Sequence, residues 1–412
     1  MQRFLSFFKL PQSRLALYGT ILEYYDYALY GFCANILAQQ LFPKLETDSA
    51  LIQTYLVFCA GSLAKPLGAL IFGWIGDLYG RRPALRWSML GIALPTLMIT
   101  ILPSQIDGKI AMIIVLLARM FQGIFIAGES DGVRIRLYET HQSHNPFISN
   151  AIVGLSSYLG IFLASQGATI AKHYPDYWRL PFLIGGVLGL CLIRARRHLT
   201  ESPKFQKPVT PWGKPNFLGL LATIMVCGAV GGTYHLFFVY QPTYWSSILS
   251  IMPATEAQSI ITICLLCYIP GLLLAAVLSE KYGGEWVLST GILLTFLFTP
   301  FLLIPSPENL PFLCMVSFSL SLMHSPGYVL LMRQFSMTSR YRHMGVGHSL
   351  GSLLMSGTAP LVATYLWQKW QSPSSFVNHM IALLAIGFIG LLISCFRQSK
   401  PSPDYSEECC SI

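Results

Sequence analysis

Hydrophobic residues along the chain gather into long stretches that short polar segments separate. A transmembrane helix needs about 20 mostly apolar residues, and these stretches reach or approach that length. They do not resemble the weak alternation over about ten residues that marks a transmembrane β-barrel strand. The pattern predicts an all-α membrane protein with twelve transmembrane helices, at residues 15–38, 51–75, 85–103, 110–137, 147–171, 178–194, 217–247, 257–279, 286–305, 310–332, 344–367 and 376–396.

The composition indicates the same class of protein. Only 11% of the 412 residues are charged and 53% are hydrophobic, and the mean hydropathy is +0.55. An average soluble protein is about 25% charged. These values exclude a soluble enzyme, a disordered protein and a secreted disulfide scaffold. Residues 1–14 are too polar for a cleaved signal peptide, so we expect the first span to remain in the membrane.

The positions of the basic residues predict the orientation. An even number of spans places both termini on one side, and 20 of the 27 Lys and Arg residues fall on that side. Five fall on the other side, and two, Lys65 and Arg119, fall inside spans. The positive-inside rule then places both termini in the cytoplasm of a protein of the inner membrane. The net charge of +9 therefore reports topology, and we expect no nucleic-acid partner.

One long polar segment divides the predicted spans into two groups of six. This segment, residues 195–216, is rich in proline and basic residues and is predicted to be a cytoplasmic linker. It separates an N-terminal six-helix bundle (1–194) from a C-terminal six-helix bundle (217–396), and a cytoplasmic tail follows (397–412).

The loops after spans two and eight repeat a pattern, which supports two related halves. An offset of 203 residues superposes Asp77 on Glu280, Tyr79 on Tyr282 and Gly80 on Gly283. Duplicated six-helix halves are typical of transporters, whose substrate site lies between the halves near the midplane. The alternative is a chance similarity between two short loops.

The first of these loops has the residues of a gate. Asp77 can cap a helix or pair with Arg81, and Gly80 permits a tight turn. Arg81 and Arg82 are placed to pair with acids at other inner helix ends. Such pairs would hold the cytoplasmic side closed and break when it opens. The alternative is a simple cluster of positive charges that anchors the loop inside.

Few ionisable residues lie inside the spans, and each is a functional candidate because a charge at the bilayer centre costs roughly 3 kcal/mol. Glu23 and Asp26 are three residues apart and share a helix face. Asp26 lies about 16 Å into its span, near the midplane. A buried carboxyl can hold a proton at neutral pH, so both are predicted proton-coupling residues. The alternative for each is a structural hydrogen bond.

Span four places a polar stripe on one face, with Gln122 and Glu129 seven residues apart and Arg119 within a turn of Gln122. We expect this stripe to face the cavity, with Glu129 as a third proton-coupling candidate. Lys65 and Arg119 could hold a substrate carboxylate, Arg with better bidentate geometry. The alternative is that each cation neutralises a buried acid inside the protein.

The second half has no acid or base deep within a span, so it is predicted to supply shape and aromatic walls. Its polar candidates are Tyr234, His235, Tyr240, Tyr244, His324 and His348. Tyr240, and Tyr30 in the first half, are taken as substrate-binding side chains. Cys264 and Cys267 lack a second ligand pair at metal-binding spacing, so we predict no metal.

Several short motifs occur in a fixed order along the chain. They are Glu23-Tyr-Tyr-Asp26, Lys65-Pro66-Leu-Gly68, Arg119-Met-Phe-Gln122-Gly123, Trp178-Arg179-Leu-Pro181, Glu201-Ser202-Pro203 and Gln241-Pro242-Thr243-Tyr244. With these motifs the chain resembles the major facilitator superfamily, and within it the metabolite–proton symporters. These include transporters of proline and betaine, 2-oxoglutarate, citrate and shikimate.

The chain departs from the family pattern at a few positions. The second loop has Gly284-Glu285 in place of an Arg pair, so its gate is expected to be weaker. Asp131 stands where the family usually has Gly, Arg333 where it tends to have Glu, and His348 where Tyr is common. The fold and transport class are expected to survive these changes.

The resemblance implies a proton-coupled symporter that imports a small carboxylate or zwitterion by alternating access. Its partners would be the substrate, H+ and the lipid bilayer, and it would act as a monomer with the proton gradient in place of a cofactor. The alternatives are an efflux antiporter of the same fold and a non-transporting sensor. An enzyme is not expected, because the chain lacks a nucleophile–base or metal constellation, and it has no phosphate-binding loop.

Overall fold

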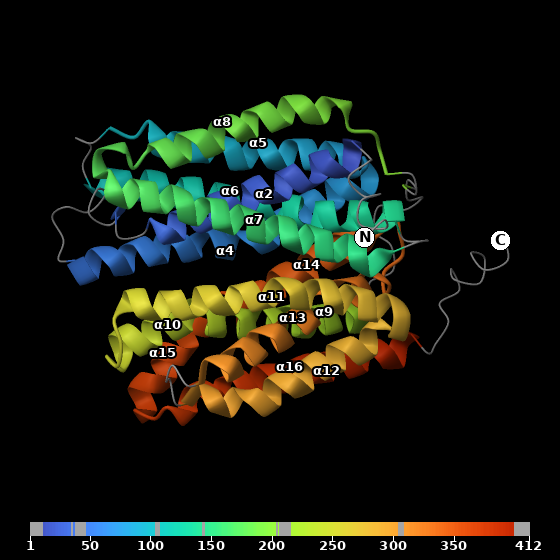
Figure 1. Ribbon diagram of the computed structural model, residues 1–412. Coiled ribbons are helices and arrows are strands. Elements are labelled where there is room, and N and C mark those ends of the chain that lie inside the picture. The colour runs from blue at the N-terminus through green and yellow to red at the C-terminus, as the bar shows by residue number, and fades with distance from the viewer. Residues whose placement is uncertain are drawn as a thin grey trace. The chain divides into compact units, whose positions relative to one another are not determined.

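The computed structural model describes residues 11–33, 36–37, 47–103, 108–141, 145–202, 205, 216–303 and 309–398. Within these ranges every regular element is a helix (Figure 1). Residues 206–215 of the predicted linker and 399–412 of the predicted tail lie outside the described part of the chain. The predicted all-α fold class is confirmed by this structure, and the described residues of the predicted spans are mostly helical.

The chain groups into two compact units. Unit 1 comprises residues 1–142, 152–213 and 337–346, and unit 2 comprises 143–151, 214–336 and 347–412. The main helices of unit 1 are α2 (Pro11–Phe32), α4 (Thr47–Leu78), α5 (Arg81–Thr100), α6 (Gly108–His141), most of α7 (Pro146–His173) and α8 (Leu180–Ala195). Unit 1 also contains the short 3₁₀ turns η1 (Pro175–Tyr177) and η2 (Arg196–His198).

Unit 2 contains more interrupted helices than unit 1. Its elements are α9 (Phe217–His235), η3 (Leu236–Tyr240), α10 (Gln241–Thr243), η4 (Tyr244–Ile248), α11 (Ala254–Tyr282), α12 (Gly284–Phe298), η5 (Thr299–Leu303), α13 (Leu310–Met332), the end of α14 (Arg340–Gly351), η7 (Ser352–Ser356), α15 (Ala359–Trp370) and α16 (Ser374–Gln398). Three of them, η3, η4 and η7, are π-helical. Such turns occur often at functional sites.

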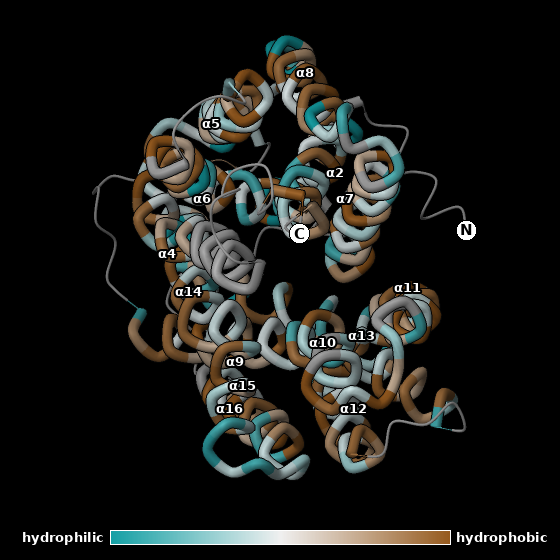
Figure 2. Tube along the Cα trace, turned by 90° about the vertical axis from the view of Figure 1, so that its left-hand side faces the viewer, coloured by the Kyte–Doolittle hydropathy of each residue, from teal (hydrophilic) through white to brown (hydrophobic). Residues whose placement is uncertain are grey.

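Seven helical segments in the described ranges are long and apolar enough to cross a membrane by length and composition. They are Ile110–Thr140, Pro146–Ala171, Phe217–Ser246, Ser259–Tyr282, Gly284–Leu303, Leu310–Met332 and Ser374–Phe396. Hydrophobic residues recur along the helices, as the brown stretches of α8 and α12 in Figure 2 show, and many of their large side chains are exposed. Leu293 on α12 and Phe396 on α16 are 57% and 75% exposed. Lipid tails rather than water cover such a surface.

Small residues bring α4 and α6 into close contact in unit 1. A methyl group on Gly123 would overlap the Gly61 carbonyl, and one on Gly68 would overlap the Ile124 carbonyl. Close backbone approach of this kind is typical of helices packed in membranes. It holds Lys65 on α4 and the polar stripe of α6 in one part of the unit.

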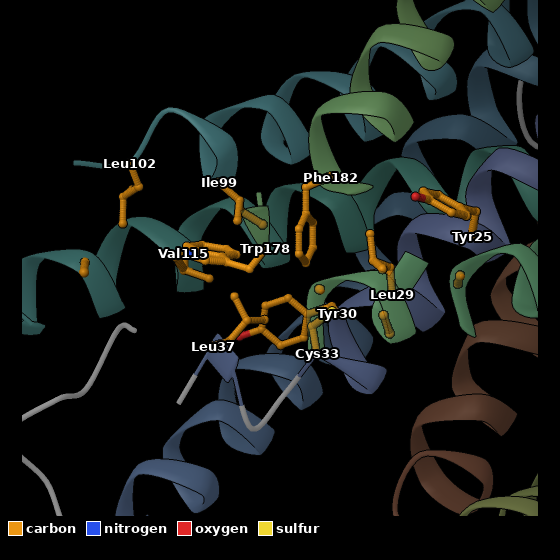
Figure 3. Packing of buried hydrophobic residues seen from close by; sticks show 14 residues of the cluster. Tyr25, Leu29, Tyr30, Cys33, Leu37, Ile99, Leu102, Val115, Trp178 and Phe182 are labelled. Atoms are coloured by element: carbon orange, nitrogen blue, oxygen red, sulfur yellow. The ribbon is translucent and has the colours of Figure 1, made fainter. Parts of the chain in front are cut away.

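An apolar core packs around α2, α5, α6, α7 and α8 (Figure 3). Trp178 and Phe182 make an edge-to-face contact with ring centroids 6.1 Å apart. The Tyr25 hydroxyl donates a hydrogen bond to the Pro181 carbonyl at 2.8 Å. Since Tyr25 lies one residue before Asp26, this contact fixes the rotation of α2 and hence the direction in which the Asp26 carboxyl points.

The loop repeat has a structural counterpart, because both of its acids cap a helix. Asp77 accepts hydrogen bonds from the backbone N–H groups of Tyr341 and Arg342, both at 3.2 Å, in the first turn of α14. Glu280 accepts them from Phe147 at 2.8 Å and from Ile148 at 3.3 Å, in the first turn of α7. A carboxylate at a helix N-terminus satisfies free N–H groups and interacts favourably with the helix dipole.

These caps explain why the compact units differ from the two continuous halves expected from the repeat. Residues 337–346 group with unit 1 and residues 143–151 group with unit 2. The beginning of α14 packs on Asp77, and the beginning of α7 packs on Glu280. Each unit therefore includes a short piece that the linear division assigns to the other half.

Glycine is required at the turn that follows each capping acid. Gly80 has φ of 106° and Gly283 has φ of 94°, a region that L side chains rarely adopt. A methyl group on Gly80 would also overlap the Glu201 carboxylate.

We expect Gly80→Ala to lower the free energy of unfolding by about 1–3 kcal/mol, because it adds backbone strain and displaces Glu201. The measurement is denaturation of the purified protein in detergent. Gly327→Ala is the matched control, since the nearest atom to its new methyl group would be 3.6 Å away, and it should be neutral or slightly stabilising. Equal stability of the two variants would contradict a requirement for glycine at residue 80.

Candidate functional site

A buried polar network surrounds Asp26 in the middle of unit 1. Asp26 Oδ1 accepts a hydrogen bond from Thr96 Oγ1 at 2.5 Å, and Oδ2 accepts one from Gln122 Nε2 at 2.9 Å. Arg119 Nη1 lies 3.7 Å from Asp26 Oδ2 and donates to Gln122 Oε1 at 2.8 Å. All four residues are at most 4% exposed. The Asp26 charge is thus balanced by one cation at a distance and by two neutral donors.

Three helices position this network. Asp26 comes from α2, Thr96 from α5, and Arg119 and Gln122 from adjacent turns of α6. The structure brings together three residues that the sequence singled out and adds Thr96. Threonine is common in apolar helices, so only its position across from Asp26 distinguishes it.

Aromatic rings lie against the two cations inside the spans. The Arg119 guanidinium lies 4.5 Å from the centroid of the Tyr30 ring, and Lys65 Nζ lies 5.0 Å from the centroid of the Tyr27 ring. Cation–π contacts of this kind stabilise a charge that has lost water. Tyr30 is therefore placed to support Arg119, whether or not it also touches a substrate.

Glu23 lies one helical turn from Asp26 and is 2% exposed. Its Oε1 accepts a hydrogen bond from Ser130 Oγ. Its Oε2 has no hydrogen-bond partner within the described part of the chain. A buried carboxyl with one unbonded oxygen can take up a proton without breaking an existing contact, so the structure leaves Glu23 chemically suited to protonation.

Glu129 lies in a separate site and forms a two-pronged ion pair with Arg196. Glu129 Oε1 pairs with Arg196 Nη2, and Oε2 accepts from Arg196 Nη1 and from Ser88 Oγ, both at 2.7 Å. Neither charged side chain is exposed at all. A methyl group on Gly19 would overlap both partners, so α2 packs directly on the pair.

This ion pair gives Arg196 and Glu129 surroundings that the sequence did not predict. Arg196 was expected among the basic residues of the inner linker, but it points into unit 1. Glu129, a predicted proton-coupling residue, is held by three hydrogen bonds from cationic and hydroxyl donors. The geometry of a well-matched bidentate pair is that of a structural contact, while a role for Glu129 in coupling stays a prediction.

The gate loop is held by a second set of buried charges. Arg81 Nη2 and Nε donate to Glu139 Oε1 and Oε2 at 2.7 and 3.2 Å, and its Nη1 donates to the Gly76 carbonyl at 2.6 Å. Glu201 accepts from the backbone N–H groups of Arg81 at 2.8 Å and Arg82 at 3.1 Å. The acid that pairs with Arg81 is Glu139, which the sequence did not single out.

Arg82 behaves differently from Arg81. Its guanidinium donates to the Arg197 carbonyl at 3.1 Å, and no acid pairs with its side chain among the described residues. Arg340 Nη1 lies 3.7 Å from Glu139 Oε1 and Arg342 Nε lies 3.6 Å from Asp77 Oδ2. The first turn of α14 therefore shares two acids with Arg81, Asp77 of the loop and Glu139 at the end of α6.

In unit 2 the candidate residues are aromatic and histidine side chains. The Tyr240 ring stacks with Tyr244 at 5.7 Å and with Phe376 at 5.7 Å between centroids. His348 Nε2 and the Tyr328 hydroxyl are 2.5 Å apart. Arg333, an atypical residue, places its guanidinium 5.0 Å from the centroid of the Phe147 ring.

No group of three or more His, Cys, Asp or Glu side chains that could hold a metal ion occurs in the part of the chain that the structure describes. The network around Asp26 consists of an ion pair, an amide and a hydroxyl group. Such groups can bind and orient a small polar solute, and a carboxyl among them can exchange a proton.

Comparison with protein families matches both parts of the chain. Residues 14–210 match the model described as sugar (and other) transporter, and residues 250–408 match the model described as Major Facilitator Superfamily. These are transporter families, and neither describes an enzyme.

Similar proteins cover nearly the whole chain. A Staphylococcus aureus protein named as a proline/betaine transporter is 30% identical over 90% of this chain and 85% of its own length. The glycine betaine/proline/ectoine/pipecolic acid transporter OusA of Dickeya dadantii is 27% identical, over 93% of this chain and 82% of its own. The solved structure of the proton:xylose symporter XylE has the same fold, with a TM-score of 0.76 at 14% identity, and covers 93% and 94% of the two chains.

The Glu129–Arg196 pair predicts strong non-additivity of mutations. Glu129→Gln or Arg196→Gln alone leaves an uncompensated buried charge and should lower the free energy of unfolding by about 3–5 kcal/mol. The double variant removes both charges and should lose much less than the sum of the two single losses. Chemical denaturation in detergent measures all four proteins of the cycle. Additive losses would show that the two charges do not depend on each other.

Proposed function

The chain belongs to the major facilitator superfamily of membrane transporters, and from this premise we propose that it is a proton-coupled symporter that imports a small carboxylate or zwitterion. The observation that carries the proposal is the network of Asp26, Arg119, Gln122 and Thr96. It joins a protonatable acid to a cation that can attract a carboxylate.

The proposed substrates are zwitterionic solutes of the proline and betaine type. Relatives that share most of the chain are named as transporters of such solutes. Arg119 and Lys65 supply positive charge inside predicted spans, and the rings of Tyr27 and Tyr30 lie beside them. A carboxylate pairs with these cations, and an ammonium group interacts favourably with an aromatic face.

The proposed coupling follows from charge balance. With Asp26 ionised, Arg119 already has a counter-ion 3.7 Å away. Protonation of Asp26 removes that counter-ion and leaves a buried, uncompensated guanidinium, which is costly unless an anion binds. The substrate carboxylate restores the balance. Proton and substrate therefore favour each other's binding, and this reciprocity is what symport requires.

Glu23 and Glu129 enter the proposal with different roles. Glu23 has one carboxyl oxygen without a hydrogen bond in the described part of the chain, and it is proposed as a second proton acceptor near Asp26. Glu129 remains a proton-coupling candidate only if its pair with Arg196 opens during the cycle. The Gln122 amide both donates and accepts hydrogen bonds. It can therefore bridge Arg119 to Asp26, or to a substrate carboxylate that takes the place of Asp26.

The gate is proposed to act at the loop of Asp77, Gly80, Arg81 and Arg82. The Arg81–Glu139 pair and the Asp77 cap hold the first turn of α14 in unit 1. We propose that these contacts keep the cytoplasmic side closed and break when it opens. In this proposal the protein is a monomer of the inner membrane with both termini in the cytoplasm, and the proton gradient replaces any cofactor.

Uptake should follow the proton gradient. In proteoliposomes with acid outside, radiolabelled proline and glycine betaine should accumulate, and a protonophore should abolish the accumulation because it removes the driving force. A sodium gradient without a pH gradient should drive none. Accumulation that follows sodium would contradict proton coupling, and export driven by proton entry would favour the efflux antiporter.

Asp26→Asn should separate coupling from binding. The amide cannot release a proton, so we expect accumulation to fall to about the equilibrium ratio of one, while exchange of labelled for unlabelled substrate continues. Asp176→Asn is the control, since Asp176 is an exposed acid in η1 and should not affect accumulation. Full gradient-driven accumulation by Asp26→Asn would remove Asp26 from the mechanism.

A further inference from the structure

Unit 2 contains a buried polar stripe that the proposed mechanism does not use. Gln241, Tyr244 and Trp245 are each at most 1% exposed. Gln241 Nε2 and Oε1, Tyr244 Oη and Trp245 Nε1 have no hydrogen-bond partner within the described residues. Buried polar atoms are almost always paired in folded proteins. Several unpaired atoms on neighbouring residues indicate that something else pairs with them during the working cycle.

The local backbone places these groups together. Gln241 begins the single turn of α10, and π-helical segments flank it on both sides, η3 at Leu236–Tyr240 and η4 at Tyr244–Ile248. Residues 241 and 245 are four apart and lie on one helix face, with 244 beside them. Interrupted helices of this kind commonly mark binding sites in transporters.

The aromatic neighbours keep the stripe in place. The Tyr244 ring stacks on Tyr240 and Phe376 and meets Trp367 edge to face at 5.4 Å. Tyr240 comes from η3, Trp367 from α15 and Phe376 from α16, so the Tyr244 ring is held by three elements. Its hydroxyl has no hydrogen-bond partner among the residues that the structure describes. The packing therefore fixes the orientation of the Tyr244 ring and leaves its hydroxyl able to bond a ligand.

The chemistry of the stripe favours an anionic oxygen ligand. A Gln amide offers two N–H donors, an indole offers one and a phenol offers one O–H, against two acceptors, the amide oxygen and the phenol oxygen. No Lys or Arg belongs to the stripe. We propose that Gln241, Tyr244 and Trp245 form a subsite in unit 2 that binds the carboxylate group of a small solute through neutral donors.

The inference rests on the proposed function, because a carboxylate-bearing solute must be carried, but it uses unit 2 alone. Neutral donors can hold a carboxylate without a fixed counter-ion. Such binding does not depend on the protonation of Asp26. The unit 2 subsite would then select a carboxylate by the geometry of its hydrogen bonds, in either protonation state of Asp26.

The test is Gln241→Leu in the full-length protein. Removing an unpaired buried amide should raise the melting temperature of the ligand-free protein, because no hydrogen bond is lost and an apolar group replaces a polar one. The same variant should bind glycine betaine about 10- to 100-fold more weakly, as measured by calorimetry in detergent. Trp245→Phe, which removes one donor and keeps a ring, should weaken betaine binding in the same direction.

The control is Gln368→Leu, an exposed position on α15, which should leave betaine affinity unchanged. Choline, which has the same ammonium group and no carboxylate, should bind wild type and Gln241→Leu equally weakly. Higher apo stability together with lost betaine affinity supports the subsite. Unchanged betaine affinity in Gln241→Leu and Trp245→Phe would overturn it and leave the proposed function standing.

Two further outcomes are also decisive. A lower melting temperature of ligand-free Gln241→Leu would mean that Gln241 is paired within the protein, and this would overturn the subsite. If wild type binds neither glycine betaine nor proline, the proposed substrate class fails, and the carboxylate subsite fails with it.

Discussion

The structure depends on one constraint: a charge buried away from water is costly, so each buried charge needs a partner in the protein. The Arg–carboxylate pairs of unit 1 meet this constraint. Arg81 pairs with Glu139, and Arg196 pairs with Glu129. These contacts join helices that are far apart in sequence, so the pairing of charges also decides how the helices pack.

The buried ion pairs differ in how closely their atoms approach, and the looser pair is the one that can open more easily. Arg196 binds both oxygens of Glu129, and Gly19 leaves just enough room for the pair. Asp26 instead lies 3.7 Å from Arg119, and a neutral amide bridges the two. A loose pair loses less when its acid is protonated. This contrast makes Asp26 rather than Glu129 the stronger candidate for coupling.

The two loops of the repeat share one contact and differ in another. Asp77 and Glu280 each cap the first turn of a helix, and Gly80 and Gly283 make the same turn. Arg81 has no counterpart, because Gly284 occupies its place. The capping contact therefore occurs in both units, whereas the buried ion pair belongs to the first loop. We therefore expect the contacts of the first loop to be harder to break than those of the second.

Sequence alone determined the helical membrane fold, because long apolar stretches have few stable alternatives in a bilayer. It also singled out Asp26 and Arg119, since a charge within such a stretch is conspicuous. Only the tertiary structure decided their partners. Arg196 looked like one more basic residue of a loop, and Gln241 carries no charge. Pairing depends on which faces of distant helices meet, and helix packing rather than local pattern sets those distances.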